Sequence, residues 1–281
     1  MTEREPHDLA ALARLEPRPD IRLIAADLDG TLVDDAKRIH DEFWPLVDEL
    51  HRRGVTFCPA SGRQYFNLLQ LFEDVAADVV FIAENGTYVV ADGRELSSDC
   101  MSLDVARQVV VRVRAIPMSG AVLCGKKSAY VERTDGAFVA QVRPYYTRLD
   151  IVHDLLDVED EILKVAVYDF VSSEQNAGPR LQEFGATHQV AISGAHWVDV
   201  MSPTANKGHA LRDVQRRLGV TPDQTMAFGD FLNDLEMMGA ATHSFAMANA
   251  HPSLKARARW TAPTNNANGV VRTIRAVLGI D

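Results

Sequence analysis

Apolar residues occur along this chain in short runs that end abruptly in polar residues. The run at 23–26 fits a strand buried on both faces of a parallel sheet, and it is followed by Asp27 and by a turn at Gly30. Similar runs at 55–60 and 79–83 alternate with helical spacing at 39–53 and 64–72. This alternation predicts a parallel sheet with right-handed crossovers.

The pattern changes after residue 86, where 87–90 and 94–96 flank an Asp-Gly turn typical of a hairpin. The following segment predicts helices over a mostly antiparallel sheet, which indicates an α+β insert. The expected helices are 103–114, 136–146 and 173–184, and the expected strands are 121–123, 128–132, 162–170, 187–192 and 196–201. The first pattern then resumes, with helices at 206–218, 231–238, 253–258 and 269–278 and strands at 225–228 and 244–247.

The sequence therefore predicts an α/β fold, a Rossmann-like parallel-sheet core domain with an inserted α+β domain. We expect residues 20–86 and 199–281 to form the core and 87–198 the insert. Residues 1–19 mix charges with prolines, and we interpret them as an N-terminal extension with one or two helical turns around 9–15.

The composition of the 281 residues, 47% hydrophobic and 24% charged, is that of an ordinary globular protein with a large core. A net charge of −10 argues against a nucleic-acid partner or an anionic membrane surface. It does not exclude a phosphorylated substrate, because a bound cation inverts the local field.

Three cysteines without C-x-x-C spacing suggest neither a disulfide framework nor a zinc site, and Cys58 is expected in the core. No apolar run approaches the length of a membrane span, and the acidic, polar beginning of the chain does not resemble a signal peptide. A cytoplasmic location is the resulting expectation. The pattern gives no indication of the oligomeric state.

Two acids, Asp27 and Asp29, follow the first strand one residue apart. In an extended chain they would lie on the same side and therefore close together. Such carboxylates repel by roughly 4 kcal/mol at the effective dielectric of a protein surface, and Mg²⁺ or a shared proton would offset this. The alternative is a pair of solvated loop aspartates that cap a helix.

Other polar residues stand at the expected ends of strands or at helix starts, which the parallel topology places at one edge of the sheet. Alone, each also has an ordinary interpretation, as a helix cap or a surface charge. The complete set is Asp27, Asp29 and Thr31, then Ser61, then Lys207, and finally Asp230, Asn233 and Asp234.

The order of these residues resembles the haloacid dehalogenase-like superfamily. Its motifs are D-x-D-G-T, a Ser or Thr at the end of a strand, a Lys, and an acidic G-D-x-x-x-D. The spacing is similar to the Cof-type subfamily, whose large α+β cap lies between the second and third motifs. The resemblance covers residues 21–281 and rests on Asp27-Leu28-Asp29-Gly30-Thr31, Ser61-Gly62-Arg63, Asn206-Lys207-Gly208 and Gly229-Asp230-Phe231-Leu232-Asn233-Asp234.

By this resemblance Asp27 is the nucleophile that forms an aspartyl-phosphate, and Asp29 is the general acid and base. Two neighbouring acids in different protonation states suit these roles. Thr31 and Ser61 would supply hydroxyl donors to the phosphoryl oxygens. Lys207 would add a positive charge at a helix start.

The resemblance also implies a Mg²⁺ site. Asp230 would hold the ion together with the carboxylate of Asp27 and the backbone carbonyl of Asp29, and Asn233 and Asp234 would bind it directly or orient its ligands.

Four residues beside the motifs are candidates for substrate or phosphate binding. Gly62 and Arg63 follow the second motif, Asn206 precedes Lys207, and Asn85 follows the third expected strand. For Arg63, Asn85 and Asn206 the alternative is a purely structural role, such as turning the chain.

The function implied is that of a Mg²⁺-dependent phosphatase, a phosphoric monoester hydrolase acting on a small phosphorylated metabolite. A sugar phosphate is the substrate that the resemblance favours, and the insert is expected to exclude bulk water. The alternatives are a phosphomutase of the same superfamily, a receiver-like phosphoacceptor protein, and an inactive binding protein. Receivers are shorter and lack the second acid of the first motif, and no motif position here is degraded.

Overall fold

The computed structural model describes residues 9–14 and 16–280 of the chain. These residues form two compact units. The core unit contains the described residues up to 61, residues 75–80 and residues 207–280, and the insert unit contains residues 62–74 and 81–206. The units divide the chain at other residues than the expected domains, which stay a prediction.

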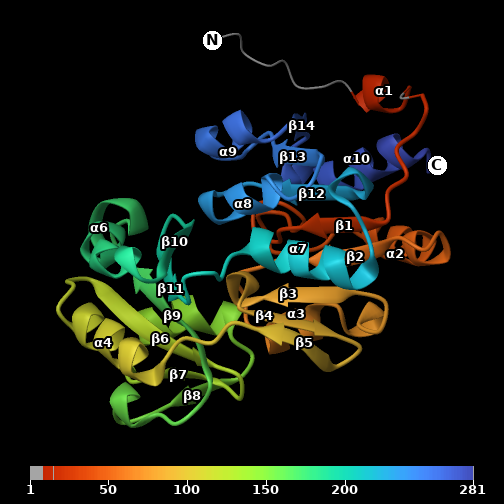
Figure 1. Ribbon diagram of the computed structural model, residues 1–281. Coiled ribbons are helices and arrows are strands. Elements are labelled where there is room, and N and C mark those ends of the chain that lie inside the picture. Colours follow the sequence, from red (N-terminus) through yellow and green to blue (C-terminus); the bar gives the residue numbers. More distant parts are fainter. Residues whose placement is uncertain (1–8, 15, 281) are drawn as a thin grey trace. The chain divides into compact units, whose positions relative to one another are not determined.

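The core unit is built on a five-stranded parallel sheet with the strand order β14-β13-β12-β1-β2. Its strands come from both ends of the chain, red and orange for β1 and β2 and blue for the other three (Figure 1). The strands are β1 (Leu23–Ala26), β2 (Thr56–Pro59), β12 (Thr225–Gly229), β13 (His243–Met247) and β14 (Trp260–Ala262).

The middle of this sheet is apolar on both faces, as a parallel sheet covered by helices requires. All four residues of β1 are fully buried, and so are the central residues of β12. The ring of Phe43, on the next helix, packs edge-on against Phe57 of β2 with centroids 5.0 Å apart. Parallel pairing in register with β12 and with β2 fixes β1 between its two neighbours.

Helices of the core unit pack on the strands, α2 on β2, α8 on β12, α9 on β13 and α10 on β14, while α7 packs on α8. Gly208 in the first turn of α7 makes that approach possible, because a Cβ there would overlap the backbone of Glu236. The helices are α1 (Leu9–Leu12), α2 (Phe43–Arg52), α7 (Lys207–Leu218), α8 (Leu235–Met238), α9 (Pro252–Arg257) and α10 (Gly269–Leu278).

The third strand, β3 (Val80–Ala83), differs from expectation. It lies in a separate three-stranded sheet with β4 (Tyr88–Ala91) and β5 (Arg94–Ser98), and a single parallel bridge joins Phe57 to Val79. The expected hairpin is confirmed, because β4 and β5 pair antiparallel. Asp92 and Gly93 take positive φ values of 48° and 66°, which suit the tight turn.

The insert unit contains a six-stranded sheet with the order β10-β11-β9-β6-β7-β8. All pairs are antiparallel except β7 with β8, so the expectation of a mostly antiparallel sheet is confirmed. The strands are β6 (Ser119–Gly125), β7 (Ala129–Val131), β8 (Leu149–Ile151), β9 (Ile162–Asp169), β10 (Gln189–Gly194) and β11 (Trp197–Met201).

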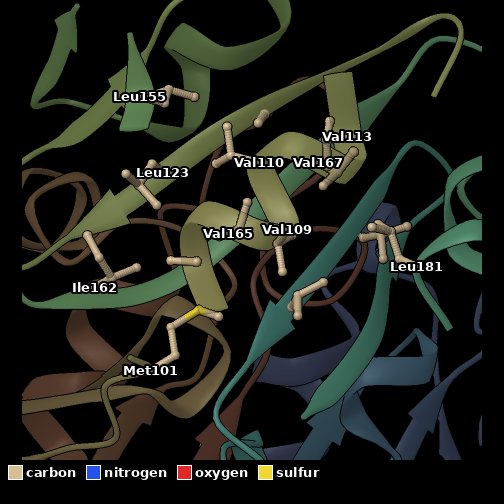
Figure 2. Packing of buried hydrophobic residues seen from close by; sticks show 14 of the residues in the cluster. Met101, Val109, Val110, Val113, Leu123, Leu155, Ile162, Val165, Val167 and Leu181 are labelled. Carbon is tan, nitrogen blue, oxygen red and sulfur yellow. The ribbon is translucent and has the colours of Figure 1, made fainter. Parts of the chain in front are cut away.

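One face of this sheet carries the packing shown in Figure 2. Val109, Val110 and Val113 project from α4 toward Leu123, Val165 and Val167 on the strands, and all of them are buried. The three valines recur at helical spacing, which explains why the pattern predicted this helix correctly. The helices of the unit are α3 (Tyr65–Leu71), α4 (Leu103–Arg114), α5 (Gly136–Val142) and α6 (Gly178–Leu181).

Several expected helices are interrupted, and two short strands, β8 and β14, were not predicted. The expected helix at 173–184 is a π-helix, a turn of α-helix and a 3-10 turn in succession. The short helical turns are η1 (Glu73–Val75), η2 (Glu84–Gly86), η3 (Arg143–Tyr145), η4 (Leu155–Asp157), η5 (Ser173–Ala177), η6 (Gln182–Ala186), η7 (Pro222–Gln224), η8 (Leu232–Asp234) and η9 (Asn265–Ala267).

The N-terminal extension contains the short helix α1 within the expected range, and it packs on α10. Residues 1–8 and 15 of that extension lie outside the described residues. Within 9–14 and 16–280, no helix has the length and apolar character needed to cross a bilayer.

We expect Gly208→Ala to lower the free energy of unfolding by about 1–3 kcal/mol, because the added methyl group overlaps the backbone of Glu236. Urea denaturation measures the change. Gly136→Ala is the matched control, since Gly136 also lies in the first turn of a helix and a Cβ there meets nothing within 4 Å. Equal loss of stability in both variants would contradict the role given to Gly208.

Candidate active site

Three strands of the core unit bring predicted site residues to one edge of the parallel sheet. Asp27 directly follows β1, and its N–H donates to the carbonyl of Phe228 at 3.0 Å. Asp230 directly follows β12, and Ser61, which is buried, comes two residues after β2. The register of β1 with both neighbours places these strand ends side by side.

Lys207 is the first residue of α7, and its side chain is completely buried. Its ammonium group donates to Oδ1 of Asp27 at 2.5 Å and to Oδ1 of Asp234 at 2.7 Å. Burial alone would lower the pKa of Lys207, but the carboxylates of Asp234 and Asp27 raise it above its usual range. The lysine therefore stays charged between two acids.

Asp234 connects this ion pair to the loop after β12. Its Oδ2 accepts the backbone N–H groups of Asp230 and Phe231 at 3.0 and 3.3 Å. The side chain is fully buried, so these bonds and Lys207 satisfy it away from water. Asn233, beside it in η8, is half-buried.

Asp230 faces the tight turn of the first motif. Its Oδ1 accepts a hydrogen bond from Oγ1 of Thr31 at 3.3 Å. Gly30 has a positive φ of 82°, and a Cβ at that position would overlap the Asp230 carboxylate. A glycine is therefore required for this close approach, which explains the glycine of the motif.

The carboxylates of Asp27, Asp230 and Asp234 form a cluster that could hold a metal ion, with ligand atoms all within 4.8 Å of one another. Burial raises the pKa of Asp27 to about 7, and Asp234 adds to the rise while Lys207 opposes it. Burial, with the charges of Asp27 and Asp234, raises the pKa of Asp230 to about 9. The site thus holds more negative charge than Lys207 alone compensates.

Both acids of the first motif come after the end of the strand and act on each other: burial is the main cause of the raised pKa of Asp27, and the charge of Asp29 adds to it. β1 ends at Ala26, and hydrogen bonds from Thr31 and Leu32 to the carbonyl of Leu28 fold the next residues into turns. The carboxylate of Asp29 is half-buried and pairs with Nζ of Lys37 at 2.7 Å. Nothing in the hydrophobic pattern indicated this lysine.

The remaining predicted residues lie in the insert unit. Gly62 and Asn85 lie against each other, since a Cβ on Gly62 would be 3.1 Å from the Asn85 amide. Arg63 is buried, donates to Asn67 at 3.1 Å and lies over the ring of Tyr145. Asn206 donates to the carbonyl of Thr204 at 3.4 Å.

Sequence reasoning missed a second buried charged group, also in the insert unit. Lys164 of β9 pairs with Glu84 at 3.0 Å and with Asp199 of β11 at 3.2 Å. Lys164 lies between apolar residues of a strand that is buried along its whole length. A single lysine in such a run was the available signal.

The sequence model of the haloacid dehalogenase-like hydrolases matches residues 24–274 of the chain. The chain belongs to this family. The match is of the Cof type, as the motif spacing predicted.

Among relatives of this hydrolase is the 5-amino-6-(5-phospho-D-ribitylamino)uracil phosphatase YbjI of Escherichia coli K12. It is 33% identical over 264 residues, which cover 92% of the chain and 96% of the relative. The HMP-PP phosphatase of Cronobacter sakazakii is 29% identical over 84% of the chain and 87% of its own length. The family match, together with relatives that are named phosphatases and align over most of their length, shows that this hydrolase is a phosphatase.

Solved structures share the fold. That of SMU.1108c from Streptococcus mutans UA159 has a TM-score of 0.85 and 26% identity, and the match covers 92% of this chain and 99% of the other. The α/β fold class that the sequence predicted is therefore confirmed.

We expect Lys207→Met to lower the free energy of unfolding by about 3–5 kcal/mol, because it leaves two buried carboxylates without their cation. Chemical denaturation in metal-free buffer measures the loss. In the control Lys255→Met, the exposed Nζ loses only its bond to the carbonyl of Ala248, and we expect a change within about 0.5 kcal/mol. Unchanged stability of the Lys207 variant would contradict the ion-pair assignment.

Proposed function

We propose that this hydrolase is a Mg²⁺-dependent phosphatase that cleaves a small phosphorylated metabolite through an aspartyl-phosphate on Asp27. The observation that carries the proposal is the buried ammonium of Lys207, 2.5 Å from the Asp27 carboxylate. A positive charge held this way beside a nucleophile also faces the oxygens of a phosphoryl group that reaches it.

In the proposed reaction an oxygen of the Asp27 carboxylate attacks phosphorus, and the bond from phosphorus to the leaving oxygen breaks. Asp29 gives its proton to that oxygen. Asp29 then takes a proton from water, and this water attacks the phosphorus of the aspartyl-phosphate, which releases inorganic phosphate and restores Asp27. The pairing of Asp29 with Lys37 supplies a partner for its carboxylate form.

The acids at the sheet edge fit a divalent cation. Asp27 and Asp230 would hold Mg²⁺ with the backbone carbonyl of Asp29, because hard cations prefer oxygen ligands. Burial and the charges of Asp27 and Asp234 raise the pKa of Asp230 to about 9, and a bound divalent ion would relieve this excess of negative charge. When bound, Mg²⁺ neutralises charge on the phosphoryl oxygens.

Further residues support these groups. Asp234 orients Lys207 and the loop that carries Asp230, and we assign Asn233 of the same turn to the surroundings of the ion. We assign the hydroxyl groups of Thr31 and Ser61 to the phosphoryl oxygens.

For the substrate we propose a small phosphorylated metabolite, with a sugar phosphate as the first class to test. The relative YbjI is named for a phosphate ester on a ribityl chain, which is a sugar-like leaving group. Gly62, Arg63, Asn85 and Asn206 are the residues that we assign to substrate or phosphate binding.

Asp27→Asn should lower phosphate release by on the order of 10³-fold or more, because an amide cannot form the aspartyl-phosphate. The measurement is release of inorganic phosphate from a panel of sugar phosphates and an aryl phosphate, with and without Mg²⁺. Asp48→Asn, an exposed acid on α2, is the control and should keep wild-type rates. Turnover by the Asp27 variant at the wild-type rate would refute the nucleophile assignment.

Mg²⁺ should stabilise the protein by about 2.7 kcal/mol at a concentration 100 times its dissociation constant, since it binds the folded site. Thermal unfolding with and without Mg²⁺ tests this. Asp230→Asn should lose most of the gain, because it removes one ligand and one charge of the cluster.

Asp223→Asn serves as the matched control, since Asp223 is an exposed acid of the core unit that accepts a hydrogen bond from Thr242. It should keep the full Mg²⁺ effect. A Mg²⁺ effect of equal size in both variants would mean that the ion binds elsewhere.

A further inference from the structure

The insert unit contains a charged cluster that the proposed reaction does not use. Lys164, Glu84 and Asp199 are 1%, 1% and 2% exposed, and the lysine pairs with both acids. Lys164 and Asp199 are diagonal neighbours on paired strands, since Met201 faces Lys164 and Asp199 faces Ala166. Burial raises the pKa of Glu84, with Lys164 opposing the rise.

A gain in stability is a weak explanation for this cluster. Taking such charges out of water costs several kcal/mol per ion, and apolar residues of similar size often stabilise a protein equally well. The neighbouring positions of β9 are apolar and buried, so an apolar residue at 164 would suit the strand. The contacts of the cluster point to a use besides stability.

The cluster contacts two of the residues that we assign to substrate binding. Nζ of Lys164 donates to the carbonyl of Gly62 at 2.6 Å. Nδ2 of Asn85 donates to Oδ2 of Asp199 in a short hydrogen bond. Because an ionised carboxylate only accepts, this bond fixes which end of the Asn85 amide is the donor and which is the acceptor.

The backbone around Asn85 is held in an unusual conformation. Glu84 and Asn85 have positive φ values of 51° and 58°, a region that costs of order 1–3 kcal/mol for residues other than glycine. The N–H of Glu84 donates to the carbonyl of Arg63 at 3.0 Å, and the hydroxyl of Thr87 donates to the carbonyl of Glu84 at 3.0 Å. Strain maintained by so many contacts is typical of functional sites.

We infer that Lys164 and Asp199 are positioning residues of the phosphatase, which set the Asn85 amide and the Gly62 carbonyl in the arrangement that receives the substrate. This inference rests on the proposed function, in which Asn85 contacts the substrate. Asp199 orients the amide, and Lys164 holds Asp199, Glu84 and Gly62 together. The alternative for Asn85 is that it only turns the chain.

Asn85→Gly separates a contact with the substrate from a role in turning the chain, because glycine adopts the positive φ without strain but has no side-chain amide. We expect this variant to raise KM roughly tenfold, the worth of a good hydrogen bond to substrate, with kcat largely kept. Lys164→Met should raise KM by a similar factor. A variant that merely contains fewer folded molecules would instead lower the apparent kcat and leave KM unchanged.

The double variant Lys164→Met with Asn85→Gly decides whether the lysine acts through the asparagine. If it does, KM in the double variant stays within about twofold of the larger single effect, because the amide is already gone. If Lys164→Met prevents folding, the double variant Lys164→Met with Glu84→Gln takes its place in these measurements. It removes one positive and one negative charge together, so fewer buried charges are left without a partner.

Asp169→Asn is the control for damage to the insert unit. Asp169 is also a buried charged residue of β9, but its oxygens accept from the backbone of Val171, Ser172 and Ala177 and from the Asn176 amide. We expect it to lower the melting temperature and leave KM unchanged.

The inference is overturned if Lys164→Met leaves KM unchanged, or if Asp169→Asn raises KM as much as Lys164→Met does. It is also overturned if the increases in KM caused by Lys164→Met and by Asn85→Gly multiply in the double variant. A normal KM for Asn85→Gly overturns it as well, and means that Asn85 only turns the chain. Asp27→Asn in the same assay tests the proposed function independently. An inactive Asp27 variant beside a normal Asn85→Gly variant would leave the nucleophile assignment standing.

Discussion

The structure depends on one ammonium group buried between two carboxylates at the edge of a parallel sheet. Lys207 reaches Asp27 and Asp234 from the first turn of α7, and Asp234 in turn holds the loop that follows β12. Without the lysine, three acids would stand together in a nearly dry environment. The packing of α7 on α8, which Gly208 permits, thus fixes the electrostatics of the whole site.

The sequence predicted this edge of the sheet because the signals for it lie within short stretches of the chain. Short apolar runs that end in Asp27, Ser61 and Asp230 indicate buried parallel strands, and the carboxyl ends of such strands meet at one edge. The position of Lys207 needed more than periodicity, since a lysine at a helix start is usually exposed. Only the order of all the motifs distinguished it.

The features that escaped prediction depend on particular hydrogen bonds and ion pairs, which the hydrophobic pattern does not encode. Asp29 was expected near Asp27, and its charge does act on Asp27, but the turn made by residues 28–32 and the pairing of Asp29 with Lys37 depend on hydrogen bonds that a period of two does not reveal. Lys164 lies in a strand predicted correctly, yet its partners are separated from it in the chain. A pattern shows which residues are buried, and it does not show which charges meet.

The neighbours β1 and β12 have the entire insert unit between them in the chain, although Leu23 pairs in register with Thr225. During synthesis the insert unit can therefore close its own apolar core while the central sheet still lacks its middle partner. Asp27 is made early, and both Lys207 and Asp230 are made late. A chain interrupted before β12 carries Asp27 without Asp230, and one interrupted before α7 lacks Lys207 as well, so the acidic cluster and its cation come together only when the last third of the polypeptide has joined the first.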